Sequence, residues 1–161
     1  MDFRPIEQLP YHDWNESPRS FGSLRAGGLR EHAGCDIYAP VETPVYAIRR
    51  GQVIRPIHLF YKDTFDIEIH HNNFIVRYCE LGLVNHALTM GAYIDGGELI
   101  GYVGKIDGLD FSMLHIEFYT GSAEGPLTNL KNPPYMRRKD LFNGTNLLNN
   151  IYGIKSKGNS L

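Results

Sequence analysis

Short runs of apolar and β-branched residues recur along most of this chain, and turn-forming residues separate them. Almost no stretch repeats apolar residues at the spacing of three and four that an amphipathic helix requires. Runs rich in Val, Ile, Phe and Tyr with Gly, Asn or Asp between them are typical of β-strands. We therefore predict strands over residues 43–48, 51–60, 65–71, 73–81, 98–104 and 112–119.

The number and spacing of these strands predict an all-β fold. We expect antiparallel, sandwich-like sheets that form a groove, with irregular loops and little helix. Residues 120–140 contain too many Gly and Pro residues for regular structure, and the segment is long enough to form one wall of the groove. The loop around residues 56–65 would form the other wall. A short helical turn is expected within residues 140–150.

The length of 161 residues fits one domain with a substantial core. We predict an N-terminal arm over residues 1–18 that lies against the body, and a single domain over residues 19–150. Residues 151–161 are predicted to form a flexible tail.

Composition and charge exclude several classes of partner. The net charge is −2, and the 16 basic and 18 acidic residues are mixed along the chain, so we expect no nucleic-acid partner. No run of about 18 apolar residues exists, which predicts no transmembrane segment. The N-terminus lacks the pattern of a secretory signal peptide. Cys35 and Cys79 are interpreted as two buried thiols rather than a disulfide framework.

Candidate metal ligands occur at two places in the sequence. His32 and Asp36 lie four apart around a small spacer, in which Gly34 allows the backbone to turn so that both side chains converge. Alternation along the strand at 112–119 places Met113, His115 and Glu117 on one face. A catalytic zinc needs three such ligands and an open fourth position. An ordinary polar sheet surface would also explain this strand when it is viewed alone.

Four ordered blocks between residues 19 and 119 resemble the lysostaphin-type (LytM-like) peptidoglycan zinc metallopeptidases. The first is FGSLRAGGLREHAGCDIYAPVETPVYAIRRGQV, which contains the H-x-x-x-D motif of that family. The others are IEIHHNNFIVRYCEL, GAYIDGGELIGYVGKI and MLHIEFY. By position, the resemblance implies that His32, Asp36 and His115 bind one Zn²⁺ per chain.

The chain departs from that family at two positions near the implied metal. Glu80 and Met113 stand where the family usually has two catalytic histidines. A carboxylate can accept the proton of an attacking water, so Glu80 is the predicted general base, whereas the thioether of Met113 can neither shuttle a proton nor donate a hydrogen bond.

Other side chains are candidates for supporting roles at the same site. Glu117 could orient His115, although a solvated sheet residue is the alternative. His70 and Tyr78 are considered as further contributors. The basic run at residues 135–140 is interpreted as a solvated loop.

The resemblance implies a zinc-dependent endopeptidase that hydrolyses stem peptides or cross-links of bacterial peptidoglycan. The alternative is a weak or inactive zinc-binding module of the same fold, which binds peptidoglycan or regulates another wall hydrolase. We expect a monomer that acts on the cell wall, in the periplasm or outside the cell. A secretion system or a phage particle would deliver it, and an immunity or secretion protein is a further possible partner.

Overall fold

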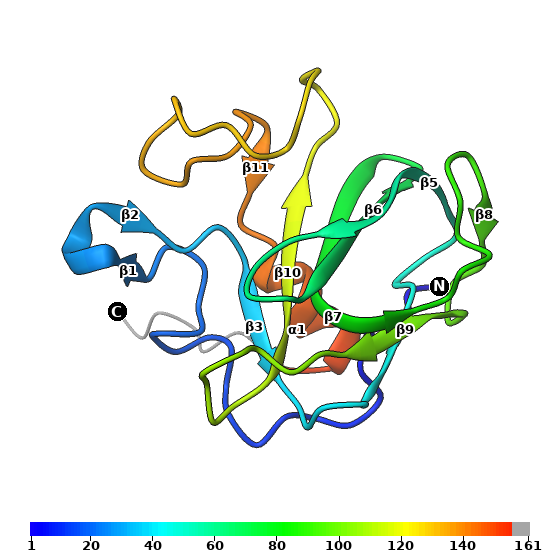
Figure 1. The fold of residues 1–161 in the computed structure, drawn as a ribbon, viewed down its shortest axis with the longest axis horizontal. Coiled ribbons are helices and arrows are strands. Elements are labelled where there is room, and N and C mark those ends of the chain that lie inside the picture. Colours follow the sequence, from blue (N-terminus) through cyan, green and yellow to red (C-terminus); the bar gives the residue numbers. More distant parts are fainter. Residues whose placement is uncertain (156–161) are drawn as a thin grey trace.

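The computed structural model describes residues 1–155, which form mainly β-strands (Figure 1). The prediction of an all-β fold is confirmed, and each of the six predicted strands corresponds to a strand in the structure. The elements are β1 (Leu24–Arg25), η1 (Ala26–Gly28), β2 (Arg30–Glu31), β3 (Cys35–Tyr38), β4 (Pro44–Tyr46), β5 (Gly51–Leu59), β6 (Phe65–His71), β7 (Phe74–Val84), β8 (Tyr93–Ile94), β9 (Leu99–Val103), β10 (Met113–Tyr119), β11 (Leu141–Phe142) and α1 (Thr145–Tyr152).

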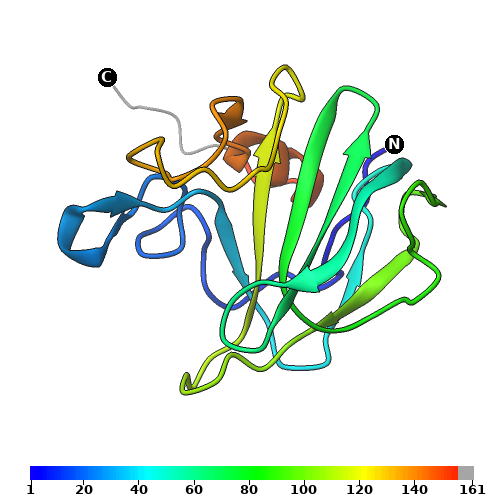
Figure 2. The same cartoon turned by 45° about the horizontal axis from the view of Figure 1, so that its top comes forward.

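A strongly curved antiparallel sheet contains nearly all of these strands (Figures 1 and 2). Its main path runs β11-β10-β7-β6-β5-β8, while β3 pairs with β10, and β9 pairs with both β4 and β7. Strand β10 therefore lies between β3 and β7. This register places His115 opposite Asp36 on one side and opposite Cys79 on the other.

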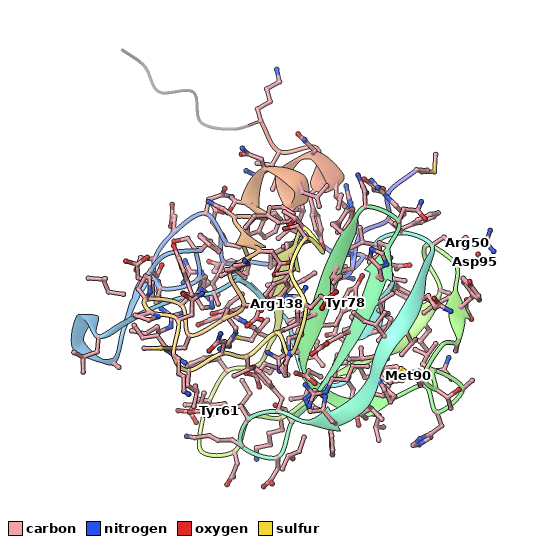
Figure 3. All side chains as sticks on the ribbon, turned by 90° about the horizontal axis from the view of Figure 1, so that it is seen from above. Arg50, Tyr61, Tyr78, Met90, Asp95 and Arg138 are labelled. Carbon is pink, nitrogen blue, oxygen red and sulfur yellow. The ribbon has the colours of Figure 1, made fainter. Side chains whose placement is uncertain are left out.

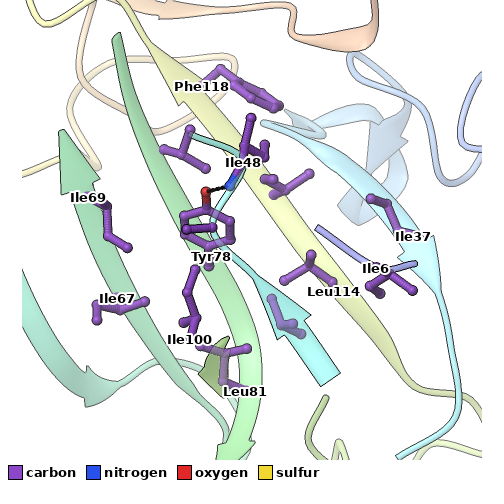
Figure 4. Packing of buried hydrophobic residues seen from close by; sticks show 14 of the residues in the cluster. Ile6, Ile37, Ile48, Ile67, Ile69, Tyr78, Leu81, Ile100, Leu114 and Phe118 are labelled. Carbon is purple, nitrogen blue, oxygen red and sulfur yellow. Dashed lines mark hydrogen bonds between the residues drawn. The ribbon is translucent and has the colours of Figure 1, made fainter. Parts of the chain in front are cut away.

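The hydrophobic core lies on one face of this sheet (Figure 4). Leu114, Ile116 and Phe118 of β10 all point into it, as alternation along the strand predicts. Helix α1 and the N-terminal arm cover this face, where Trp14 donates a hydrogen bond from Nε1 to Asn149 at 3.0 Å. Because the apolar residues are buried on this side, the opposite face of β10 is left for polar side chains.

The two ends of the described chain both pack against the body. Ile6 and Trp14 of the arm are buried. The predicted tail begins too early, because α1 runs to Tyr152, which is buried and donates a hydrogen bond to the carbonyl of Ile6 at 2.6 Å. The rest of that predicted tail, residues 156–161, lies outside the described residues. Within residues 1–155, no helix has the length and apolar character needed to cross a membrane.

Candidate metal centre

His32, Asp36 and His115 converge on one point at the polar face of the sheet. Asp36 and His115 are cross-strand neighbours on β3 and β10, and His32 lies on the segment that leads into β3. Oδ1 of Asp36 is 2.8 Å from Nδ1 of His115 and 3.0 Å from Nε2 of His32. The two ring nitrogens are themselves 3.0 Å apart. Residues far apart in the sequence thus bring three metal-ligating atoms together.

The spacing of these atoms fits a small divalent cation. Ligands at about 2.0–2.2 Å from a tetrahedral zinc lie about 3.4 Å from one another. The observed separations of 2.8–3.0 Å need to open by only a few tenths of an ångström. Two imidazoles and a carboxylate are also a donor set that zinc accepts, and three protein ligands leave its fourth position open.

Hydrogen bonds at the far side of each ring orient both histidines toward this point. The carbonyl of Ser20 accepts a hydrogen bond from Nδ1 of His32 at 2.9 Å, so Nε2 carries the free lone pair. Oε1 of Glu117 is 3.0 Å from Nε2 of His115 and accepts its proton, which leaves Nδ1 facing Asp36. Metal-bound imidazoles are usually held in this way.

The three side chains shift the pKa values of one another. Burial alone would raise the pKa of Asp36, but the hydrogen bond from His115 and the closeness of His32 hold the pKa well below its usual range. Burial alone would lower the pKa of His115, but hydrogen bonds to the carboxylates of Asp36 and Glu117 raise it to about 9. The proton on Nδ1 of His115 thus occupies the position that a cation would take.

Gly34 is needed for close packing against β10, and not for the backbone turn that the sequence predicts. A Cβ on Gly34 would lie 2.2 Å from the carbonyl oxygen of Ile116 and 3.0 Å from Cε1 of His115. The backbone of Gly34 does not have a positive φ, so its conformation does not require a glycine. The glycine therefore permits close approach of the chain to β10, which keeps His32 near His115.

Glu117 is the centre of a buried ionic network below His115. Arg137, from the loop that precedes β11, donates to Oε1 of Glu117 at 2.9 Å, and the hydroxyl of Tyr119 donates to Oε2 at 2.5 Å. Nη1 of Arg77 lies 3.6 Å from the same carboxylate. The interpretation of Glu117 as a solvated sheet residue is therefore wrong, because the side chain is completely buried and contacts His115.

The basic run at residues 135–140 is also not a solvated loop. Arg137 and Arg138 are both buried. Arg138 forms an ion pair with Asp140 at 2.6 Å and donates to the carbonyl of Gly125 at 2.9 Å, which ties the 120–140 segment together. Sequence reasoning misses these roles because the partners are distant or lie within an irregular loop.

A second group of potential ligands, Cys79, His115 and Glu117, also lies close together. Two arginines already compensate the carboxylate of this group. Burial raises the pKa of the Cys79 thiol well above its ordinary value, which disfavours the thiolate that binds metals. Cys35 and Cys79 are both free thiols and both buried. We therefore assign the candidate metal centre to His32, Asp36 and His115.

Glu80 reaches the groove through a β-bulge in β7. Ile67 pairs with Tyr78 and Phe65 with Leu81, so two residues of β7 oppose one residue of β6. Glu80 has a φ of 65° at this irregularity. Simple alternation would send Glu80 to the core with Tyr78, and the bulge redirects it to the side of the groove.

The carboxylate of Glu80 is held by one residue of the neighbouring loop. Thr64 lies with its Oγ1 2.7 Å from Oε2 of Glu80 and 2.6 Å from the carbonyl of Tyr61. A hydroxyl has one hydrogen, so Thr64 can donate to only one of these two acceptors at a time. Burial raises the pKa of Glu80, while the hydrogen bond from Thr64 opposes this.

The remaining predicted residues lie in different places. Met113 is buried beside the centre and lines the same groove as Glu80. Tyr78 does not reach the site, because its side chain is on the core face of β7, where its hydroxyl accepts from the backbone of Ile48 at 3.0 Å (Figure 4). His70 is exposed near the C-terminal end of β6 and is not at the site.

A groove of about 960 Å³ opens over these side chains. Its walls come from the loop after β5 and from the 120–140 segment, as predicted, and also from the β1–β2 hairpin. Figure 3 shows Tyr61, one of its lining residues, on the loop between β5 and β6. Phe60 stacks on His115 with ring centroids 6.2 Å apart. The structure therefore combines a buried trio of ligand atoms with a groove whose volume is typical of ligand-binding sites.

Arg25 is a residue of this groove that the sequence analysis missed. It lies on the hairpin, with Nη2 3.5 Å from Oδ2 of Asp36, and its side chain is 22% exposed. The sequence offers no signal for this contact, because the hairpin bends over the sheet through tertiary packing.

A buried His-Asp-His trio at the base of a groove has the layout of a catalytic zinc site, in which three protein ligands leave the fourth position open. Residues 30–126 match peptidase family M23, and the chain belongs to this family. The resemblance to lysostaphin-type peptidases is thereby confirmed.

Sequence relatives agree with this assignment, and solved structures share the fold. The chain is 28% identical to the peptidoglycan DD-endopeptidase ShyC of Vibrio cholerae over 80% of its own length, and covers 28% of ShyC. Its fold is similar to the antimicrobial peptidase lysostaphin from Staphylococcus simulans, with a TM-score of 0.63 and 20% identity over 88% of this chain and 52% of the other. A zinc-containing peptidase from Vibrio cholerae gives a TM-score of 0.59 and 22% identity, over 73% of this chain and 36% of the other.

Proposed function

We propose that this protein is a zinc-dependent endopeptidase that hydrolyses peptide bonds of bacterial peptidoglycan. The observation that carries the proposal is the convergence of His32, Asp36 and His115 within 3.0 Å of one another at the base of a groove. Membership of family M23 supports the reaction type. The name of the relative ShyC supports the substrate class, although the chain spans only about a quarter of that protein.

The proposed mechanism divides the work between the ion and the protein. Zinc, when bound, would supply an activated water and polarise the carbonyl under attack. Glu80 would accept a proton from the attacking water and return it to the leaving amine. Phe60, which covers His115, would limit access of bulk solvent.

Digestion of purified sacculi tests this function directly. Zinc-loaded protein is expected to release new peptide fragments that mass spectrometry can identify, and the cleaved bond follows from their masses. Removing the metal with a chelator is expected to stop the release, and adding Zn²⁺ back to restore it. If fragments never appear although zinc is bound, the protein is better described as an inactive binding or regulatory module.

Arg25 is proposed to compensate for the hydrogen-bond donor that Met113 lacks. Its guanidinium lies beside the carboxylate of Asp36 and lines the groove, where it can donate to the carbonyl oxygen as negative charge develops. Arg25→Ala is expected to lower kcat by about 10²- to 10³-fold, the effect of losing one such donor. Arg25→Lys is expected to recover part of the loss.

The affinity for zinc separates this role from a structural one. Calorimetric titration of the Arg25→Ala apoprotein with Zn²⁺ is expected to give an affinity close to that of the wild type, because Arg25 is not a ligand. An unchanged kcat, or a loss of kcat that only follows loss of zinc, would rule out the proposed contact with the substrate.

We also propose that the protein acts outside the cytoplasm, where peptidoglycan lies. The proposal depends on the substrate class alone. The delivery route, by a secretion system or a phage particle, stays a prediction, as do a monomeric state and an immunity or secretion partner. Immunodetection in fractionated cells tests the location, and protein found only in the cytoplasm during wall cleavage would contradict it.

A further inference from the structure

A second cavity of about 520 Å³ lies between the N-terminal arm and the sheet. Residues of the arm, including Leu9 and Tyr11, form one side, and the segment after β3 forms the other. Tyr38 and Phe111 line both this cavity and the groove over His32, Asp36 and His115. The two hollows are therefore neighbours that share an aromatic wall.

Four aromatic rings form a continuous series along this second cavity. Phe111 stacks on Tyr38 with centroids 5.2 Å apart, His12 meets the edge of Tyr38 at 5.5 Å, and Tyr11 meets His12 at 5.3 Å. Arg19 lies over the ring of Tyr38. The exposed rings are Phe111, which is 44% exposed, Tyr11, which is 97% exposed, and His12 between Tyr11 and Tyr38. Exposed aromatic side chains at a concave surface are a common mark of a binding site.

The charges of the two hollows differ sharply. Five arginines line the groove over the metal centre, together with Glu31, Asp36 and Glu80. Among the described residues that line the second cavity, none is Asp, Glu, Lys or Arg, and the polar members include Gln8, His12, Thr43 and Ser112. A ligand of the second cavity should therefore be uncharged, with apolar faces for stacking and several hydroxyl or amide groups.

We propose that the second cavity binds an N-acetylated sugar of the glycan strand that carries the peptide substrate. This inference rests on the proposed function, because the sugar and the peptide belong to one polymer. A pyranose ring presents C–H groups to an aromatic face, and its acetamide and hydroxyl groups suit neutral partners.

The position of the cavity agrees with the chemistry of that polymer. Tyr38 is two residues from Asp36 on β3, which corresponds to about 6.6 Å along the strand. A peptide spans about 3.3–3.6 Å per residue, so a stem of three or four residues reaches about 10–14 Å from a bond cut over the metal. This length carries a substrate past Tyr38 and Phe111 to the second cavity.

Binding is tested without any cleavage. A β-1,4-linked tetramer of N-acetylglucosamine is titrated into ¹⁵N-labelled protein, and NMR shifts are expected at Tyr11, Ala39 and Phe111. Tyr11→Ala is expected to weaken the binding about five- to tenfold, the effect of one aromatic contact. Tyr93→Ala, which removes another exposed tyrosine that lies on β8, is the matched control and should bind as the wild type does.

Kinetics then connect the sugar to the reaction. Cleavage of the same cross-linked peptide is measured with and without its attached disaccharides. The kcat/KM value of the substrate that carries disaccharides is then divided by the kcat/KM value of the bare peptide. Tyr11→Ala is expected to lower this ratio by about five- to tenfold, whereas Tyr93→Ala should leave it unchanged.

The outcomes separate this inference from the proposed function. If neither substrate is cleaved, the proposed function fails, and the tetramer titration still decides whether sugar binds. If the tetramer causes no shifts at the cavity up to about 10 mM, well above the millimolar affinity of a weak site, the inference is overturned. Shifts caused by the free stem peptide instead would assign the cavity to a peptide extension and would also overturn it.

Discussion

Replacing His115 by alanine is expected to abolish both zinc binding and hydrolysis. Nδ1 of His115 is one of three converging ligand atoms, and its removal leaves only His32 and Asp36. Loss of a hydrogen-bond partner of a metal ligand already costs about 10- to 100-fold in affinity, so loss of the ligand itself should exceed this range. The affinity is measured by competition with a chromogenic zinc chelator, and hydrolysis by release of fragments from sacculi.

A graded series separates loss of a ligand from damage to the fold. Asp36→Asn preserves the shape of the second ligand, and should also lose zinc and activity. Glu117→Gln retains His115 but weakens its orientation, and should lower zinc affinity by about 10- to 100-fold. His70→Ala, an exposed histidine near the far end of β6, is the control. Full zinc binding by a folded His115→Ala protein, judged by circular dichroism, would remove the trio as the metal centre.

The parts of this site that the sequence predicts are those that follow from local periodicity. Alternation along β10 separates His115 and Glu117 from the apolar residues, and the structure has this arrangement. The short spacing between His32 and Asp36 limits their separation, and the path of the chain through Gly34 brings the two side chains within 3.0 Å. The resemblance to a known family then supplies the long-range link between Asp36 and His115.

The parts that the sequence could not predict depend on irregular backbone or distant packing. Alternation alone gives Glu80 the wrong face, because nothing local marks the bulge after Tyr78. The burial of Arg137 depends on Glu117, twenty positions earlier, and a basic run in a Gly- and Pro-rich loop gives no sign of it. Tyr78 is among the predicted contributors to the site, yet the pleat turns its ring into the core.

Replacing Glu80 by glutamine is expected to lower kcat by about 10²- to 10⁴-fold, the usual contribution of a positioned acid or base. Glutamine has nearly the same shape and still accepts the hydrogen bond from Thr64, but it cannot take a proton from water. Zinc affinity should stay close to that of the wild type, since Glu80 is not among the converging ligand atoms. Single-turnover assays on a soluble cross-linked peptide measure the chemical step, with Glu98→Gln outside the groove as the control.

Thr64→Val distinguishes a positioned base from a carboxylate that merely lines the groove. This change removes the hydroxyl 2.7 Å from Glu80 with little change in volume, so the carboxylate loses the contact that fixes it. If positioning matters, kcat should fall, though by less than in Glu80→Gln, because the proton acceptor is still present. Full activity of Glu80→Gln would assign the proton transfer to another group. Loss of zinc from Glu80→Gln would instead give Glu80 a role in binding the metal, which its hydrogen bond to Thr64 does not support.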